Sequence, residues 1–505
     1  MPCLMGRNFV TLPPDFYRKP ILMLTYTPPE MRAAPPTREK PWILLLLAFA
    51  WLWPGVFSHD LWKPDEIWFN EAVNGVLSGG SWLQPQVPGR QDGGMPFVYV
   101  WLAAWCRRLL SPWLTDAYSA MRLASVLFTA VGLTACGMAG FHLAGRHQGR
   151  SVVLILIGCA GLITSGHLLG GASVQFAAAG LCLYGLAVAR RRAVFAALLL
   201  GCGWALLSVS AGWAVMAALM LAACLLPLFP VWRSRRFAVS LAAAFALAVP
   251  LAAVYPLALY QVSPEAFSGW LNHHVFGVFG GLATFSAAFS LPYYLKNLLW
   301  FAFPAWPLAL WTFSRRRFLS ESWGGPTVLW LAAVGLLLSV APQTHADNLI
   351  LLLPPLAVLG ACRLDSLRRG AAAFFNWFGI MIFGLLAVFL WIGFSAMNFG
   401  WPAKLAERSA YFSPYYTPEF DVVPILTALL FTPLWLWAVT RKNVKGRQAV
   451  TNWAAGMTLV WALLMTLFLP WLDAAKSYRP VVARMEAAAP AELRERRACF
   501  SIDET

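Results

Sequence analysis

Two neighbouring carboxylates, Asp65 and Glu66, stand just after the first strongly apolar block of the sequence. Paired acids at the edge of a membrane are partly desolvated, and one of them can act as a general base toward a hydroxyl or an amine. The same residues can instead form the acidic first turn of a helix, with Asp65 as its cap and no chemistry attached. The residue types alone leave both interpretations open.

Polar side chains recur in two later segments that also lie between apolar blocks. Asn272, His273 and His274 precede a glycine-rich run, and neighbouring histidines point in different directions on a helix. We therefore expect a loop that closes over a headgroup rather than a metal site, and no cofactor of any kind. His345 and Asp347 lie at the mouth of another apolar block, where they can bind sugar hydroxyls or simply cap a helix.

The composition indicates that lipid surrounds the scaffold that holds these residues. Of the 505 residues, 59% are hydrophobic and only 12% are charged, which is too much apolar surface for one water-soluble core. The net charge of +16 does not indicate nucleic-acid binding, because the arginines and lysines form short clusters between apolar blocks. The nine cysteines show no CxxC spacing, so neither a disulfide framework nor a zinc site is expected.

The apolar blocks are close to the length that crosses a bilayer, and they predict an all-α polytopic protein with about thirteen transmembrane helices. Their approximate ranges are 42–58, 120–145, 151–166, 173–189, 193–211, 213–231, 237–258, 293–313, 325–341, 349–362, 374–395, 422–440 and 451–471.

Charge asymmetry sets the expected orientation. With a cytoplasmic N-terminus, the short basic clusters between spans fall on the cytoplasmic side and most acidic residues fall outside, as the positive-inside rule requires. Three outer segments are then long enough for chemistry, namely 58–119, 260–292 and 396–421. Residues 1–41 are expected to be a cytoplasmic leader before an uncleaved anchor, 42–472 the transmembrane domain and 473–505 a periplasmic tail.

The first outer segment carries a specific pattern around the acid pair. It contains Trp62-Lys63-Pro64-Asp65-Glu66, then Glu71, Gly80-Ser81-Trp82 and Pro96-Phe97-Val98-Tyr99-Val100-Trp101. This pattern resembles the first periplasmic loop of the aminoarabinose transferase and protein mannosyltransferase superfamily, which are GT-C glycosyltransferases that use polyprenyl-phosphate sugars. The patches Tyr293–Phe301 and Leu351–Ala357 extend the resemblance through the membrane region.

The resemblance implies a GT-C-like fold and assigns roles to individual residues. Asp65 corresponds to the carboxylate regarded as catalytic in that family, with Glu66 supporting it. The tail after Asp473 is shorter than the soluble domain that related bacterial enzymes usually carry. The residues expected to bind substrate are Lys63, Glu71, Tyr99, His273, His274, Tyr293, Lys296, His345 and Asp347.

Three positions that are often cationic in the family are not cationic here. The arginine that follows the acid pair is Trp68, the lysine before Pro96 is Met95, and the lysine of a later turn corresponds to Ser210. A phosphate leaving group needs positive partners, and each charged hydrogen bond contributes on the order of 1 kcal/mol or more. Lys63 and Lys296 are the substitutes we favour, with Arg90 and Arg122 as further candidates.

The expected function is transfer of a sugar from a polyprenyl phosphate to a lipid or envelope glycan, at the periplasmic face of a bacterial inner membrane. The expected partners are the lipid-linked donor, the acceptor and membrane lipid, and not nucleic acid. A catalytically inactive relative that binds polyprenyl-linked lipid or a partner protein is the main alternative. A lipid-linked sugar transporter is less favoured, because the predicted spans contain almost no charged residues.

Overall fold

The computed structural model describes residues 41–63, 65–85, 87, 96–275, 289–314, 318–342, 344–418, 421–440 and 446–488. Arg90, Met95 and the run that follows Val275 lie outside these residues, and so do the side chains of His273 and His274. The chain divides into two compact units, Met1–Ile43 and Leu44–Thr505, and almost all of the described residues belong to the second. All regular structure in the described residues is helical, which agrees with the predicted all-α class.

The α-helices are α1 (Pro41–Leu52), α2 (Asp65–Leu77), α3 (Phe97–Leu110), α4 (Ala117–Ala144), α5 (Arg146–Ile157), α6 (Ala160–His167), α7 (Ala172–Val188), α8 (Ala193–Ser210), α9 (Trp213–Leu225), α10 (Arg235–Val262), α11 (Pro264–Trp270), α12 (Leu291–Phe301), α13 (Ala305–Phe313), α14 (Gly324–Ser339), α15 (Leu353–Cys362), α16 (Arg369–Phe399), α17 (Ala403–Phe412), α18 (Val422–Val439), α19 (Gly446–Leu467), α20 (Leu469–Lys476) and α21 (Arg479–Ala488). Short 3-10 helices are η3 (Leu226–Leu228), η4 (Pro230–Trp232), η7 (Phe318–Ser320), η8 (Ala346–Leu352) and η9 (Leu364–Ser366), and η5 (Leu271–Val275) is a π-helix.

Six helices in the described part of the chain are long and apolar enough to cross a membrane: α4, α8, α10, α16, α18 and α19. A seventh span is possible if α5 and α6 count together, although they bend by 76° at their junction. Five shorter apolar helical stretches, such as Ala172–Val188, add to these. The chain is therefore a multi-pass membrane protein, while the number thirteen stays a prediction.

Breaks within the predicted spans explain why the described residues contain fewer long helices than the thirteen predicted spans. The predicted span 151–166 is interrupted between Ile157 and Ala160, and 293–313 is divided into α12 and α13 before Ala305. Several other predicted spans contain helices shorter than a bilayer needs, such as α15 within 349–362. Hydropathy finds an apolar run, but it does not find a bend within that run.

Small residues bring the central helices close together. α4 packs on α5 and α7, α7 packs on α8, and α8 packs on α10. Gly132 of α4 faces the ring of Phe176, and Gly203 of α8 faces Cys182, both on α7. Membrane helices associate in this way, because burial from lipid gives no hydrophobic driving force and close packing must supply the attraction.

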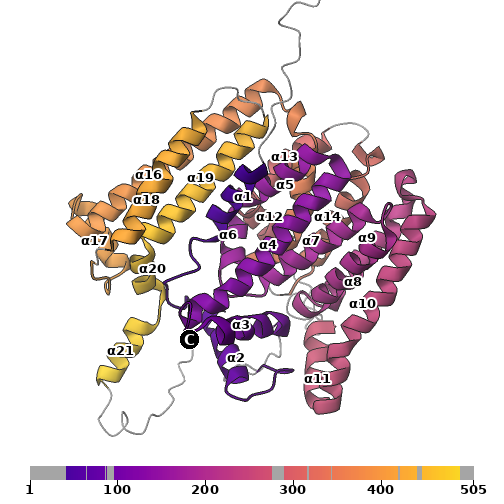
Figure 1. The fold of residues 1–505 in the computed structure, drawn as a ribbon, viewed down its shortest axis with the longest axis horizontal. Helices are drawn as coiled ribbons and strands as arrows, with labels where there is room; N and C mark the ends of the chain where they lie inside the picture. Colours follow the sequence, from indigo (N-terminus) through magenta and orange to yellow (C-terminus); the bar gives the residue numbers. More distant parts are fainter. Residues whose placement is uncertain are drawn as a thin grey trace, which may run out of the picture. The chain divides into compact units, whose positions relative to one another are not determined.

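A second group of helices, α16, α18 and α19, follows later in the chain and appears in orange and yellow in Figure 1. Trp453 of α19 packs among the rings of Phe375 and Phe383 of α16. The outer faces of this group expose large apolar side chains, including Phe374 and Leu385. Lipid is the environment that such faces require.

The predicted first outer segment, 58–119, contains α2 and α3, which pack on each other and on the beginning of α4 (Figure 1). Phe69 and Val73 of α2 meet Tyr99 and Val100 of α3 in a buried cluster that also includes Met121 of α4. The side chain of Asp116 caps α4 by accepting hydrogen bonds from the backbone N–H groups of the second and third helical residues. The acid pair therefore belongs to a packed helical unit, and not to an open loop.

Candidate active site

The two carboxylates of the acid pair have opposite environments. Asp65 is the first residue of α2 and is exposed, whereas Glu66 is only 2% exposed. Successive residues on a helix are rotated by about 100°, so a helix that lies on the protein surface can bury one side chain and expose its neighbour. The Asp65 side chain is therefore accessible from the surface, and the Glu66 side chain is not.

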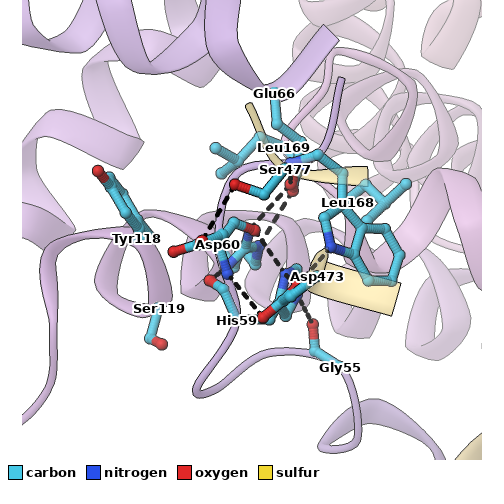
Figure 2. Close-up of polar contacts among 12 residues, drawn as sticks. Gly55, His59, Asp60, Glu66, Tyr118, Ser119, Leu168, Leu169, Asp473 and Ser477 are labelled. Carbon is cyan, nitrogen blue, oxygen red and sulfur yellow. Dashed lines mark hydrogen bonds and ion pairs between the residues drawn. The ribbon is translucent and has the colours of Figure 1, made fainter. Parts of the chain in front are cut away.

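The Glu66 carboxylate accepts four hydrogen bonds (Figure 2). The guanidinium of Arg122 donates to both oxygens, from Nε to Oε1 at 3.0 Å and from NH2 to Oε2 at 2.8 Å. The backbone N–H groups of Trp62 and Leu169 donate to the same carboxylate at 2.8 Å and 3.0 Å. Burial raises the pKa of Glu66, but the charge and hydrogen bonds of Arg122 outweigh it and hold the pKa below its usual value.

Arg122 is fully buried on α4 and connects the acid pair to the preceding segment. It also donates from NH1 to the carbonyl of His59 at 3.0 Å and from NH2 to the carbonyl of Asp60 at 2.7 Å. Burial and the nearby guanidinium lower the pKa of His59 to about 4, so its ring is neutral at pH 7. The Glu66–Arg122 pair thus fixes the beginning of α2, and Asp65 with it, to α4.

A segment from the end of the chain packs on the residues before Asp65. We call Asp473–Arg479 the C-terminal clasp. Asp473 accepts hydrogen bonds from the indole of Trp62 at 2.7 Å and from the backbone N–H of Asp60 at 3.2 Å. Asp60 in turn accepts from Ser477 Oγ at 3.0 Å (Figure 2). It also pairs with Arg479, whose Nε donates at 2.9 Å.

The charge of the clasp changes when the Asp473 carboxyl gains or loses a proton. Burial raises the pKa of Asp473 to about 6, although the Trp62 indole opposes this effect by donating to the ionised form. The side chain of Lys476 lies over the Trp62 ring, with Nζ 4.4 Å from the ring centre. The tail predicted for 473–505 therefore begins with residues that contact the acid-pair segment, and no local sequence pattern identified them.

Lys63 lies two residues before Asp65 and is exposed. Its Nζ is 5.1 Å from the centre of the Tyr478 ring, and its backbone N–H donates to the carbonyl of Lys476 at 3.3 Å. This cation is near Asp65 in the chain and remains at the surface. Arg122, the other candidate cation close to the acids, is buried against Glu66.

Two further predicted residues of the first segment have different surroundings. Tyr99 is fully buried, and its hydroxyl lies 2.8 Å from Ser125 Oγ on α4, where burial raises the pKa of the phenol. Glu71 is half-buried on α2 and accepts hydrogen bonds from the amides of Asn70 and Asn74. Tyr99 is positioned as a packing residue, whereas Glu71 lines a cavity at the α2–α3 unit.

Asp347 belongs to a separate polar group at the beginning of η8. It accepts a hydrogen bond from Ser165 Oγ of α6 at 2.6 Å. The neighbouring Asn348 donates to the hydroxyl of Tyr294, on α12, at 3.0 Å. Ser165 lies near the end of α6, and the backbone N–H of Leu169, two residues after this helix, donates to Glu66.

The remaining predicted residues have different surroundings, and the ring of Tyr293 contacts the ring of Tyr294. Tyr293 and Lys296 are exposed on α12, and His345 is the exposed residue that precedes η8. His273 and His274 lie on η5, and their side chains are outside the described residues. Trp68 is half-buried beside the α2–α3 cluster, and Ser210 Oγ donates to the carbonyl of Leu206. Within the described ranges no group of three His, Cys, Asp or Glu residues could hold a metal ion.

Comparison with known proteins supports the resemblance that the sequence pattern indicated, and it does so along most of the chain. No protein-family model matches. The chain is 25% identical to the undecaprenyl phosphate-alpha-4-amino-4-deoxy-L-arabinose arabinosyl transferase of Pseudomonas aeruginosa (strain UCBPP-PA14) over an alignment of 457 residues, and the match covers 85% of this chain and 76% of that protein. The transferase of the same name from Pseudomonas paraeruginosa (strain DSM 24068 / PA7) is also 25% identical, over 456 residues with the same coverage of each chain.

The fold is similar to that of a solved transferase. The crystal structure of ArnT from Cupriavidus metallidurans in the apo state has a TM-score of 0.62 and 16% sequence identity, and the match covers 90% of this chain and 81% of that one. The structure of the same protein bound to undecaprenyl phosphate has a TM-score of 0.59 and 15% identity, with the same coverage.

Proposed function

Because the chain is a distant relative of the ArnT transferases and has their GT-C fold, we propose that it transfers a sugar from a polyprenyl-phosphate donor to a lipid or envelope glycan acceptor. The reaction takes place at the periplasmic face of a bacterial inner membrane, where the acid pair and the outer segments are expected. The resemblance of the sequence to GT-C transferases is confirmed by these relatives. The donor, the acceptor and the membrane face on which transfer occurs are what we propose.

The observation that carries the proposal is the exposed Asp65 next to the buried Glu66–Arg122 pair. Asp65 accepts the proton of the acceptor hydroxyl or amine while that oxygen or nitrogen forms a bond to the anomeric carbon. The bond between the anomeric carbon and the phosphate oxygen breaks, and polyprenyl phosphate leaves with the electron pair. Glu66 does not touch the substrate; it positions Asp65 through Arg122, and a fixed geometry is worth a large part of the rate.

The leaving phosphate gains negative charge and needs a cation. Lys63 is the best candidate for this cation, because it is exposed and lies two residues before Asp65. Lys296 on α12 is the second candidate, at an exposed position four residues after the outer segment 260–292. A lysine on a long, flexible stem can follow a phosphate that moves during the reaction.

An inactive relative that binds polyprenyl-linked lipid is the alternative function. It is favoured by one observation, namely that Arg122, a candidate phosphate partner, already pairs with Glu66 in a fully buried site. In this alternative the acid pair serves only to hold α2 in place.

Mass spectrometry of envelope lipids and glycans from cells with and without the chain tests the proposal. Transfer predicts an acceptor whose mass increases by one sugar only in cells that contain the chain. Identical lipid and glycan profiles, obtained while the donor lipid is present in both strains, would support the inactive relative instead.

A further inference from the structure

A cavity of about 610 Å³ lies at the α2–α3 unit, and its lining side chains include Glu71, Asn74, Leu77, Val87 and Arg107. This volume is within the usual range of small-molecule sites. Asn74 follows Asp65 by nine residues, which is two and a half helical turns, so the cavity and Asp65 lie on opposite sides of α2. The cavity is therefore not part of the proposed transfer site.

The cavity holds a positive and a negative group that are kept apart. The Arg107 guanidinium donates to Asn74 Oδ1, and the amide nitrogen of Asn74 donates to Glu71 Oε1 at 3.4 Å. The ion pairs found among the described residues include none between Arg107 and Glu71, so the carboxamide separates the two charges. Each charged group retains capacity for a ligand, because a guanidinium has five N–H donors and a carboxylate has two oxygens.

A buried polar atom beside this chain of contacts has no assigned partner. Asn70 donates from its amide nitrogen to Glu71 Oε1 at 3.2 Å, and its side chain is only 7% exposed. Its carbonyl oxygen, Oδ1, lacks a hydrogen-bond partner within the described part of the chain. A buried acceptor without a partner is costly, but Asn70 is not among the residues that line the cavity, so the charges of Arg107 and Glu71 carry the choice of ligand.

The outer face of α3 indicates the depth of the cavity relative to the lipid. Trp105 is 54% exposed and Leu109 is 66% exposed, and the turn after the helix exposes Trp113 by 90%. Trp105 and Leu109 are both about 200° from Arg107 around the helix, so the apolar face is opposite the cavity. Tryptophan and leucine on one face of a helix are typical of insertion at the boundary between headgroups and acyl chains. A helix inserted at that boundary would hold Arg107 and Glu71 at the level of lipid headgroups.

We propose that the cavity binds the headgroup of a phosphatidylethanolamine lipid, with its phosphate on Arg107 and its primary ammonium on Glu71. The headgroup carries both charges on a short linker, which matches two opposite charges held apart by one carboxamide. Phosphatidylglycerol has the phosphate but no ammonium for Glu71. Phosphatidylcholine has both charges, but its methylated nitrogen cannot donate a hydrogen bond to a carboxylate.

Native mass spectrometry of the full chain in detergent, with equal amounts of these three lipids, tests the proposal. We expect phosphatidylethanolamine adducts to be about tenfold more abundant than either other lipid, as the loss of one charged contact implies. Glu71→Gln should reduce phosphatidylethanolamine binding to the level of phosphatidylglycerol. Arg107→Gln should weaken both by about tenfold, whereas Arg107→Lys should retain most of the binding.

Arg108→Gln is the matched control, because Arg108 is the exposed neighbour on α3 and does not line the cavity. It should leave the order of the three lipids unchanged. Equal retention of all three lipids by the natural protein would overturn the proposal, as would equal losses for Arg107→Gln and Arg108→Gln in variants with unchanged melting temperature. No sugar donor is present in this assay, so its outcome does not depend on the proposed transfer.

Discussion

Replacing Arg122 by glutamine should strongly destabilise the protein. The change leaves the Glu66 carboxylate, which is 2% exposed, without its counter-charge, and it removes four hydrogen bonds donated by the guanidinium. Breaking a buried ion pair from one side typically costs about 3–5 kcal/mol, because the remaining charge is uncompensated. The free energy of unfolding of the purified protein, measured by SDS titration in mixed micelles, should fall by that amount.

A double-mutant cycle with Glu66→Gln makes the test specific. The double variant should be less destabilised than the sum of the single variants by at least about 1 kcal/mol, because neither charge is then left alone. Arg363→Gln is the matched control, since its pair with Glu321 is exposed on both sides and should contribute less than about 1 kcal/mol. Equal effects of Arg122→Gln and Arg363→Gln, or strict additivity in the cycle, would refute the idea that a buried pair anchors α2.

Two more predictions concern protonation and packing. The stability of Asp473→Asn relative to the natural protein should rise by about 2–3 kcal/mol between pH 4 and pH 7, since a carboxyl whose pKa is raised to about 6 loses stability as pH rises through that value. The amide accepts through one oxygen only, so the variant loses one of the carboxylate's two hydrogen bonds at both pH values, and this loss cancels in the comparison. A difference between the two proteins that stays constant from pH 4 to pH 7, measured by thermal melting, would contradict this. Gly132→Ala should lower the free energy of unfolding by about 1–3 kcal/mol, because its new Cβ would lie 2.4 Å from the Phe176 ring. Gly335→Ala, which has nothing within 4 Å of the new Cβ, should be neutral or stabilising. Equal melting temperatures for the two variants would show that α4 and α7 pack less closely than this distance requires.

Much of the site could be predicted where neighbours in sequence determine the structure. The acid pair at the beginning of α2 follows from local pattern, and so does the apolar character of the long helices. The residue types allowed both a chemical and a capping interpretation of the pair. In the structure the two residues have different surroundings, since Asp65 is exposed in the first turn and Glu66 is buried.

Contacts between distant parts of the chain could not be predicted in the same way. The sequence offers Arg122 as a candidate phosphate partner, but it lies 56 residues from Glu66 in sequence and no local signal pairs them. The clasp contact between Trp62 and Asp473 spans 411 residues. The sequence shows that Asp473 is an acid at the end of an apolar block, but it does not indicate which segment this acid contacts.

Transfer assays with the purified protein test the central proposal most directly. The reaction contains undecaprenyl phosphate carrying one of a panel of sugars, together with extracted envelope lipids, and the product is detected by mass. The natural chain should transfer a sugar, and Asp65→Asn should reduce the rate by about 10²–10⁴-fold without changing the melting temperature. Full activity of the folded Asp65→Asn variant would contradict the proposed role of this carboxylate.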